Sequence, residues 1–424
     1  MKKILSLMLT LCLLLGCVCA FASCGDENGE AEQVKVLDEV SLGEKFTIPD
    51  DFKIGFIFLH DENSTYDLNF INAANTIKSH LGLTDEQVIM EINIPEEGNY
   101  CYDAAIRLVN KGCKIIFADS FGHEDNMIRA AEANPNVQFC HATGTKALVK
   151  TDLPNYHNAF ASIYEGRFLA GIAAGMKLNE MIEEGEIEAD EAVIGYVGAF
   201  PYAEVVSGYT SFFLGARSVC ESATMKVRYT DSWYDYDAEK AAAKSLIEID
   251  NCVLISQHAD SLGAPSLCEE KKVPNVSYNG STVDAGPNTF IISSAINWAP
   301  YFYYIIDSYV KGQDIAPNWC GTIATGSVVL SKMNSAVAAD GTAEAIADAV
   351  AKMKNGELHV FDCDTFKVNG AKVTEYLADV VDKGDFAGET NVIHADGYFQ
   401  ESTFRSAPYF DLRIDGITEI NSAN

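Results

Sequence analysis

Positive charge is scarce in this chain. It has 30 Lys and Arg residues against 61 Asp and Glu residues, a formal net charge of −31 over 424 residues. Nucleic-acid binding needs clustered cations that neutralise phosphates, so this balance argues against a nucleic-acid partner. It also argues against capture of a strongly anionic ligand by bulk attraction. We interpret the acidity as a means of staying soluble outside the cell.

Familiar catalytic and metal-binding motifs are missing as well. The sequence contains no G-x-S-x-G elbow, P-loop, H-E-x-x-H motif or C-x-x-C pair. The glycines Gly195 and Gly198 do not complete a dinucleotide fingerprint. The runs that begin at His60 and His123 place three polar residues in a row, which cannot all face one ion, so we interpret them as solvated loops. We therefore expect no catalysis, no metal and no cofactor.

The N-terminus carries an apolar run. Lys2 and Lys3 precede an almost unbroken apolar stretch up to Ala22, and Ser23-Cys24 follows. A basic start, a short apolar region and small residues before a cleavage point are typical of an export signal. A cysteine directly after the small residues resembles a bacterial lipoprotein signal. We predict a signal peptide over 1–23, lipid on Cys24, and an acidic tether over 24–52.

This signal places the protein on the extracytoplasmic face of the membrane, held by lipid rather than by a spanning helix. The residues after Cys24 are acidic, which argues against a permanent transmembrane anchor. The alternative is an ordinary secretory signal that happens to be cleaved near a cysteine.

Eight cysteines remain after the signal and the proposed lipid site. An even number in an exported protein permits disulfides. However, Cys113 and Cys252 adjoin apolar segments typical of strands, where a free thiol packs well. The sequence leaves the pairing open.

From Lys53 onward, short apolar segments alternate with segments of helical periodicity. This pattern indicates parallel sheets covered by helices on both faces. It runs once to about residue 160 and then repeats, so we predict an α/β protein of two doubly wound lobes with a ligand cleft between the carboxyl ends of their strands. The N-terminal lobe is predicted at 53–160 plus about 286–322, and the C-terminal lobe at 161–285 plus about 323–424.

Three hinge segments are expected where the chain passes between the lobes, near residues 158–165, 284–288 and 317–326. The tail after about residue 360 has no assigned role. Its segment 407–416 is interpreted as one or two strands.

Five motifs in register carry a family resemblance: Asp119-Ser-Phe-Gly, Tyr164-Glu-Gly-Arg-Phe-Leu-Ala-Gly, Ile194-Gly-Tyr-Val-Gly, Asp231-Ser-Trp-Tyr-Asp and Asn297-Trp-Ala-Pro-Tyr-Phe. Their order and spacing resemble the basic membrane protein (PnrA-like) family of substrate-binding lipoproteins, over about residues 53 to 330. The resemblance implies a type I periplasmic-binding-protein fold. It implies a purine nucleobase or nucleoside as ligand and an ATP-binding-cassette permease in the membrane as partner. We expect the protein to be a monomer.

The candidate ligand-binding residues are polar and aromatic side chains at predicted strand ends. They are Tyr66, Asp67, Asn69, Ser120, Phe121, Trp233, Asp235, His258, Asp260, Asn279, Asn297 and Trp298. A purine has apolar faces and polar edges, so its receptor should stack aromatic rings on the faces and direct a few polar groups at the edge.

Our hypothesis is that Phe121 or Tyr66 from one lobe and Trp233 from the other enclose the base. Asp260, Asn279 and Asn297 would then contact its edge or a ribose. By position, Trp233 falls where the resembled receptors carry a stacking aromatic, and Asn279 where they carry an acidic residue for the ribose hydroxyls. An amide carries no charge, so the sequence leaves base and nucleoside equally open.

Other interpretations remain. Trp233 and Trp298 could be core residues, Phe121 could plug the space between the lobes, and Asp260 could cap a helix. The whole protein could be a surface receptor or sensor that takes no part in transport. A nucleoside-acting enzyme is a further alternative, although Asp61, Glu62 and Asp67 do not have the spacing of a calcium-dependent nucleoside hydrolase.

Overall fold

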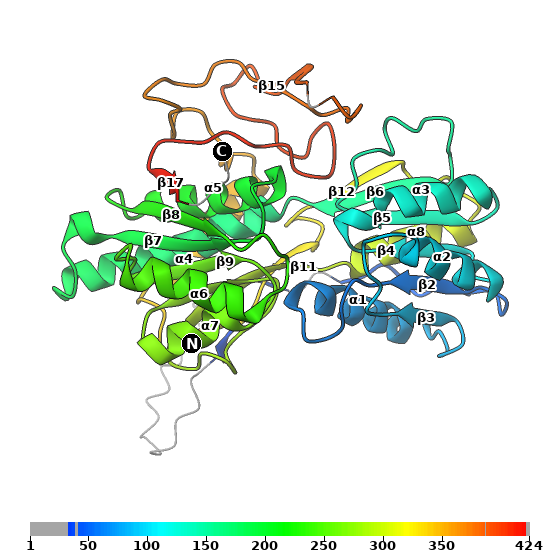
Figure 1. Cartoon of the computed structure of the whole chain (residues 1–424), viewed down its shortest axis with the longest axis horizontal. Helices are drawn as coiled ribbons and strands as arrows, with labels where there is room; N and C mark the ends of the chain where they lie inside the picture. Colours follow the sequence, from blue (N-terminus) through cyan, green and yellow to red (C-terminus); the bar gives the residue numbers. More distant parts are fainter. Residues whose placement is uncertain (1–32, 39–40, 386, 421–424) are drawn as a thin grey trace, which may run out of the picture.

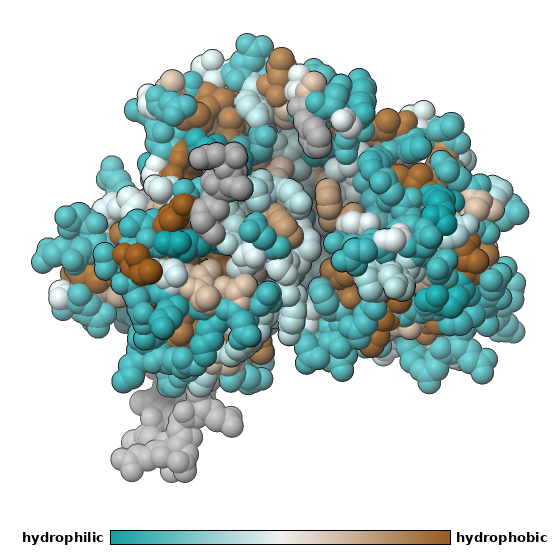
Figure 2. Space-filling view, viewed as in Figure 1, coloured by the Kyte–Doolittle hydropathy of each residue, from teal (hydrophilic) through white to brown (hydrophobic). Residues whose placement is uncertain are grey.

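A computed structural model describes residues 33–38, 41–385 and 387–420. The predicted signal peptide and Cys24 lie outside the described residues. Two α/β lobes stand side by side, and the C-terminal tail lies across the top of the molecule in the view of Figure 1. Hydrophilic residues cover most of the face shown in Figure 2, and a furrow separates the two lobes there.

The first lobe is built on a six-stranded parallel sheet with the order β12-β6-β5-β4-β2-β3. Apolar side chains point alternately to its two faces, as a strand requires. Phe56 and Phe117 pack on the side of α1 and α8, while Ile57 and Ile116 pack on the side of α2 and α3. The elements are β2 (Ile54–Ile57), α1 (Thr65–Leu81), β3 (Val88–Glu91), α2 (Tyr100–Asn110), β4 (Ile115–Ala118), η1 (Phe121–His123), α3 (Glu124–Ala133), β5 (Gln138–Ala142), β6 (Tyr156–Ala161), α8 (Ala299–Val310) and β12 (Asn318–Gly321).

The second lobe is built on a seven-stranded sheet with the order β13-β11-β10-β9-β7-β8-β17. Its strands are parallel except for β13, which runs antiparallel to β11. The elements are α4 (Ile163–Glu183), η2 (Ala189–Glu191), β7 (Val193–Gly198), α5 (Ala203–Arg217), β8 (Thr224–Tyr229), α6 (Tyr236–Glu248), β9 (Leu254–His258), α7 (Gly263–Lys271), β10 (Asn275–Tyr278), β11 (Phe290–Ile296), β13 (Val328–Leu330), α9 (Thr342–Lys354) and β17 (Ile417–Glu419). Two small two-stranded sheets join β1 (Gln33–Val34) to β14 (Met333–Asn334) and β15 (Leu377–Ala378) to β16 (Thr390–Asn391).

The small residues of α4 allow very close packing against α5. A β-carbon on Gly171 would lie 2.0 Å from the carbonyl oxygen of Phe212. A β-carbon on Gly215 of α5 would lie equally close, 2.0 Å, to the carbonyl oxygen of Phe168. The glycines therefore set the distance between these two helices, on one face of the second sheet.

The chain crosses between the two sheets after Ala161, after Ile296 and after Gly321. The first and third crossings fall inside the predicted hinges at 158–165 and 317–326. The second does not fall at 284–288, because β11 pairs in parallel with β10 and so belongs to the second sheet. We therefore propose that the return segment of the first lobe begins at about residue 297 rather than 286.

The tail departs from the prediction at 407–416, which forms no strand although Tyr409, Phe410 and Ile414 are buried. The side chain of Arg405 explains the irregular backbone. It donates hydrogen bonds to the carbonyl oxygens of Ala407, Pro408, Asp379 and Val380. These bonds take the place of a strand ladder, and pairing resumes only at β17.

The eight described cysteines are all unpaired, and all but Cys320 are buried. Burial raises the pKa of the Cys140 thiol, for example, to about 12. Buried free thiols of this kind act as small apolar side chains. Among the described residues no helix is both long and apolar enough to cross a bilayer.

Candidate functional site

A cavity lies between the lobes, where the carboxyl ends of the two sheets face each other. Residues after β2, β4 and β5 and at the start of α1 form its first wall. The start of α5 and the ends of β8, β9 and β10 form the opposite wall. The lining residues are Leu59, His60, Tyr66, Asp67, Ser120, Phe121, Thr143, Glu204, Trp233, His258, Asp260, Tyr278 and Asn279.

Eight of the twelve residues predicted from the sequence line this cavity, which lies at the strand ends where the site was expected. They are Tyr66, Asp67, Ser120, Phe121, Trp233, His258, Asp260 and Asn279. Five further lining residues were not predicted from the sequence: Leu59, His60, Thr143, Glu204 and Tyr278. All five also lie at strand ends or in the first turn of a helix, so the expectation of a site at strand ends, applied without a preference for particular residue types, would have included them.

The other four predicted residues lie outside the cavity lining. Asn69 lies further along α1, and Asp235 caps α6, where its Oδ1 accepts a hydrogen bond from Ala238 N at 2.9 Å. Asn297 holds the crossover: its Nδ2 donates to Gly326 O at 3.1 Å, and its Oδ1 accepts from Ala299 N. Trp298 is a core residue, 1% exposed.

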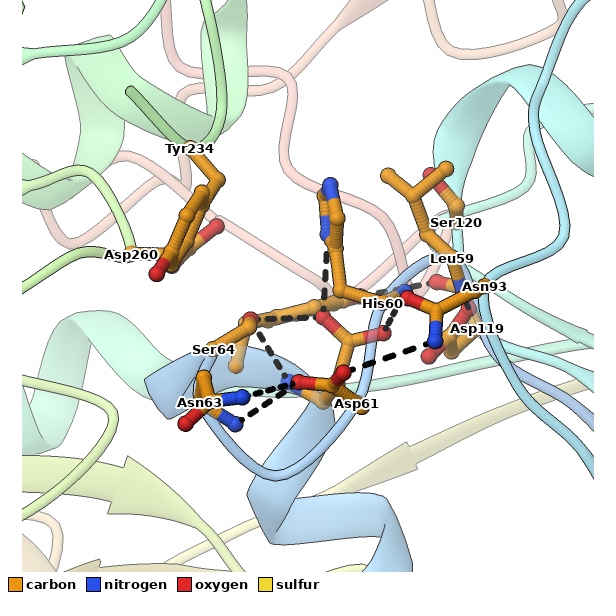
Figure 3. Close-up of polar contacts among 12 residues, drawn as sticks. Leu59, His60, Asp61, Asn63, Ser64, Asn93, Asp119, Ser120, Tyr234 and Asp260 are labelled. Carbon is orange, nitrogen blue, oxygen red and sulfur yellow. Dashed lines mark hydrogen bonds and ion pairs between the residues drawn. The ribbon is translucent and has the colours of Figure 1, made fainter. Parts of the chain in front are cut away.

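The carboxyl groups of Asp67 and Asp119 shape the wall contributed by the first lobe. Figure 3 shows Leu59, His60, Ser64 and Asp119 in this part of the site. Asp67 accepts hydrogen bonds from His60 N at 2.7 Å and from Ser64 Oγ at 2.6 Å. Burial raises the pKa of Asp67, but these hydrogen bonds outweigh burial and leave it below its usual value. Asp119 accepts from Leu59 N at 3.1 Å, and burial together with the charge of Asp67 raises its pKa well above the ordinary value. The pKa values of these two neighbouring carboxyl groups are thus shifted in opposite directions, and both groups fix the loop after β2.

The two lobes touch directly beside the cavity. The carbonyl oxygen of Asp260 in the second lobe accepts from Thr65 N at 3.1 Å and from Thr65 Oγ1 at 3.2 Å in the first. The Oδ1 atom of Asp260 accepts from Asn279 Nδ2 at 3.0 Å. Burial, with the charge of Glu239, raises the pKa of Asp260 well above its usual range. The structure is therefore a closed arrangement, with one side of the cavity sealed by backbone and side-chain hydrogen bonds.

Aromatic rings from both lobes meet at the mouth of the cavity. The rings of Phe121 in the first lobe and Tyr202 in the second lie 5.7 Å apart. Trp233 packs edge to face on Phe200 at 5.2 Å. Tyr66 is fixed by a hydrogen bond from its hydroxyl to Asp119 O at 2.8 Å. A flat ligand between the lobes would meet apolar ring surface from both sides.

Three buried polar atoms on the second-lobe wall have no hydrogen-bond partner among the described residues: His258 Nε2, Tyr278 OH and Asn279 Oδ1. Buried polar groups are normally satisfied, because an unmade hydrogen bond leaves the desolvation cost uncompensated. These three atoms are therefore the ones that a ligand could satisfy. No group of three or more His, Cys, Asp or Glu side chains within the described ranges could hold a metal ion.

Residues 77–362 match the family described as "ABC transporter substrate-binding protein PnrA-like". The chain belongs to this family. The predicted family is thus confirmed. The PnrA-like proteins are solute-binding proteins rather than enzymes. They bind small molecules outside the cytoplasm and work with ABC permeases.

Among relatives of this PnrA-like chain, a purine-binding protein of Brucella abortus (strain 2308) is 30% identical over 338 residues, which are 78% of this chain and 89% of the relative. A putative ABC transporter glucose-binding protein of Haloferax volcanii is 31% identical over 253 residues, 60% of each chain. A solved ABC transporter solute-binding protein from Conexibacter woesei aligns with a TM-score of 0.59 at 16% identity, covering 73% of this chain and 98% of that one. Similarity to such structures confirms the predicted type I periplasmic-binding-protein fold.

Proposed function

We propose that this substrate-binding protein captures a purine, as base or nucleoside, between its lobes and delivers it to an ABC permease. The observation that carries the proposal is the closed cavity, with aromatic rings from both lobes and three unsatisfied buried polar atoms on one wall. A purine supplies what these features lack, namely two apolar faces and an edge of hydrogen-bonding atoms. The purine-binding relative from Brucella abortus supports this ligand class.

The charges of the lining favour an uncharged ligand. Asp67, Glu204 and Asp260 are acidic, and the described lining residues include no Lys or Arg. A nucleotide would bring phosphates against these carboxyl groups without a cation to neutralise them. We therefore propose the base or the nucleoside, and not the nucleotide, as the transported form.

A sugar is the second candidate, favoured by the glucose-binding relative from Haloferax volcanii. Carboxyl and amide groups such as those of Asp260 and Asn279 can hydrogen-bond sugar hydroxyls as well as a ribose. The aromatic rings contributed by both lobes favour the purine, because a flat ring presents apolar surface on both faces.

Calorimetric titration distinguishes these ligands. The chain starting at Asp26, which keeps every described residue, would be titrated with adenine, guanine, hypoxanthine, adenosine, guanosine and inosine, and with glucose and amino acids as controls. Micromolar or tighter binding of a purine supports the proposal, and comparison of each base with its nucleoside shows whether ribose is required. Binding of glucose and of no purine would assign the site to sugars instead.

The predicted lipid anchor at Cys24 completes this proposal, because a tethered receptor stays close to its permease. Mass spectrometry of protein from the membrane fraction should find an N-terminal peptide that begins with lipid-modified Cys24. An unmodified cysteine there, or an N-terminus at another residue, would refute the anchor.

A further inference from the structure

A buried cation lies behind the cavity wall. Arg167 of α4 is 0% exposed, and no Asp or Glu side chain in the described residues forms an ion pair with it. Its guanidinium donates instead to neutral oxygens. Nη1 donates to Ser277 O at 3.0 Å, and Nη2 donates to Ser256 Oγ at 2.7 Å and to Tyr196 OH at 3.2 Å. Burying a charge costs free energy unless the charge is paired or well hydrogen-bonded, so the presence of an unpaired Arg167 in the core suggests that it has a function.

The hydroxyl of Tyr196 connects Arg167 to the cavity. It lies 3.4 Å from Nδ1 of His258, whose side chain lines the cavity. A guanidinium can only donate, so the oxygen of Tyr196 accepts from Arg167 and the single hydroxyl hydrogen is left to donate elsewhere. Within the described chain, His258 Nδ1 is the acceptor within reach of it.

The hydrogen bonds from Arg167 to Tyr196 and from Tyr196 to His258 decide which ring nitrogen of His258 carries the proton. Burial lowers the pKa of His258, although Glu204 opposes the shift, so the ring is neutral at neutral pH. A neutral imidazole has one N–H and one acceptor nitrogen. If Nδ1 accepts from Tyr196, the proton resides on Nε2. If Nδ1 donated instead, the hydroxyl hydrogen of Tyr196 would have no acceptor.

The Nε2 atom has no hydrogen-bond partner in the described chain, and the carboxylate atom Glu204 Oε1 lies 3.7 Å away. Glu204 lies in the first turn of α5 and also lines the cavity. Gly208 of the same helix makes room for the ring, since a β-carbon there would lie 2.4 Å from His258 Nδ1. A donor and an acceptor thus stand side by side on one wall.

We propose that Arg167 and Tyr196 orient His258 so that its Nε2–H donates to a ring nitrogen or oxygen of the ligand, while the neighbouring Glu204 accepts from a ligand N–H or O–H. This inference rests on the proposed function and deepens it. The site then selects ligands whose edge presents an acceptor next to a donor, as a purine edge does. Arg167 and Tyr196 are positioning residues, and His258 and Glu204 read the ligand.

Nitrogen NMR of the ligand-free protein tests the orientation without any ligand. Protein labelled with ¹⁵N-histidine gives well-separated signals for protonated and unprotonated ring nitrogens, and the variant His258→Gln identifies the signals of His258. We expect the proton on Nε2 in the wild type and a mixture of both forms in Tyr196→Phe. Tyr301→Phe is the matched control, because it removes another buried tyrosine hydroxyl, in the first lobe, and should leave the signals unchanged.

A proton on Nδ1 of the wild type would overturn the proposal, and so would signals of Tyr196→Phe identical to those of the wild type. Tyr196→Phe is used instead of an Arg167 variant because it removes one oxygen atom and keeps the ring, so the variant should fold as the wild type does.

Binding measurements then test the ligand side. Adenine and its 1-deaza, 3-deaza and 7-deaza analogues, each of which lacks one ring acceptor, would be titrated into the wild type and into His258→Leu. One analogue should lose about tenfold in affinity relative to adenine in the wild type, and this loss should disappear in His258→Leu. Equal losses in both proteins would overturn the role of His258. If no purine binds at all, the proposed ligand class fails, while the NMR result still decides the orientation of the ring.

Discussion

At the scale of single residues, Trp233 is the side chain from which we expect the largest contribution to binding. It is partly buried and lines the cavity beside Phe200 and Tyr202. Stacking of an aromatic side chain on a base contributes about 1–3 kcal/mol. The substitution Trp233→Ala should therefore weaken purine binding roughly 5- to 150-fold in calorimetric titration.

Trp319→Ala provides the matched control for this prediction. Trp319 lies in β12, packs on Tyr301 and Tyr304, and is absent from the cavity lining. Its loss should leave purine affinity within about twofold of the wild type. Unchanged affinity in a folded Trp233→Ala protein would remove Trp233 from the site.

The two tryptophans singled out in the sequence show what residue-level prediction could achieve. Trp233 follows a strand and lines the cavity, as expected, whereas Trp298 stacks on Phe70 at 4.5 Å inside the core. Both follow the end of a strand within a few residues. Only tertiary packing against α1, which the local sequence does not reveal, makes one of them a core residue.

At the scale of elements, one buried carboxyl group holds the loop between β9 and α7. Glu239 in the first turn of α6 accepts hydrogen bonds from Ser261 N at 3.1 and 3.2 Å. Burial raises its pKa from 4.5 to about 7. The folded state thus holds a proton more tightly than the unfolded chain, and this stabilisation is complete below about pH 4.5 and is lost as the pH rises to about 7.

The variant Glu239→Gln keeps an acceptor for Ser261 N and cannot ionise. Relative to the wild type it should gain on the order of 1–3 kcal/mol in free energy of unfolding as the pH rises from about 4.5 to about 7.5. Urea unfolding at several pH values across this window measures the difference. A difference that stays constant over the window would contradict the raised pKa.

Periodicity in the sequence indicates helices more reliably than it indicates every strand. The segment 300–310 has helical periodicity and forms α8 at Ala299–Val310. In β11, by contrast, Ser293 and Ser294 interrupt the apolar pattern of a buried strand. The hydroxyl of Ser294 accepts from Arg167 Nη1 at 3.4 Å in the core. The partner that makes a serine acceptable there is 127 residues away in the sequence, so no local pattern indicates it.

At the scale of the whole molecule, both ends of the described chain connect the two lobes. Near the N-terminus, β1 pairs with β14 of the second-lobe segment, while Glu44 O accepts from Tyr303 OH of α8 in the first lobe. The C-terminal tail pairs with the second sheet through β17, while Asp382 Oδ2 accepts from Thr145 Oγ1 of the first lobe at 2.6 Å. The cavity thus lies in a molecule whose lobes are tied at points outside the site itself.

The contact between the tail and the first lobe should favour the closed form, because a tail anchored on the second sheet must release Thr145 when the lobes separate. A ligand held by both lobes binds most tightly when the closed form is already populated. The substitution Asp382→Ala removes a hydrogen bond of about 0.5–1.5 kcal/mol and should weaken ligand binding by roughly two- to tenfold. Small-angle X-ray scattering of the ligand-free variant should show a larger radius of gyration.

Two further variants make this prediction specific. Thr145→Ala should have the same effect as Asp382→Ala, and the double variant should be no worse than either one, because all three lack the same bond. Asp385→Ala is the control, since that carboxylate accepts from Ala387 N within the tail, has no hydrogen bond to the first lobe among the described residues, and should leave affinity and size unchanged when replaced. Additive losses in the double variant would mean that the two residues act separately and that the tail does not bias closure through this contact. If the single variants lose ligand affinity and the double variant loses no more, the tail contributes to binding although it touches no part of the cavity. This contribution would explain why the tail packs across both lobes instead of ending at α9.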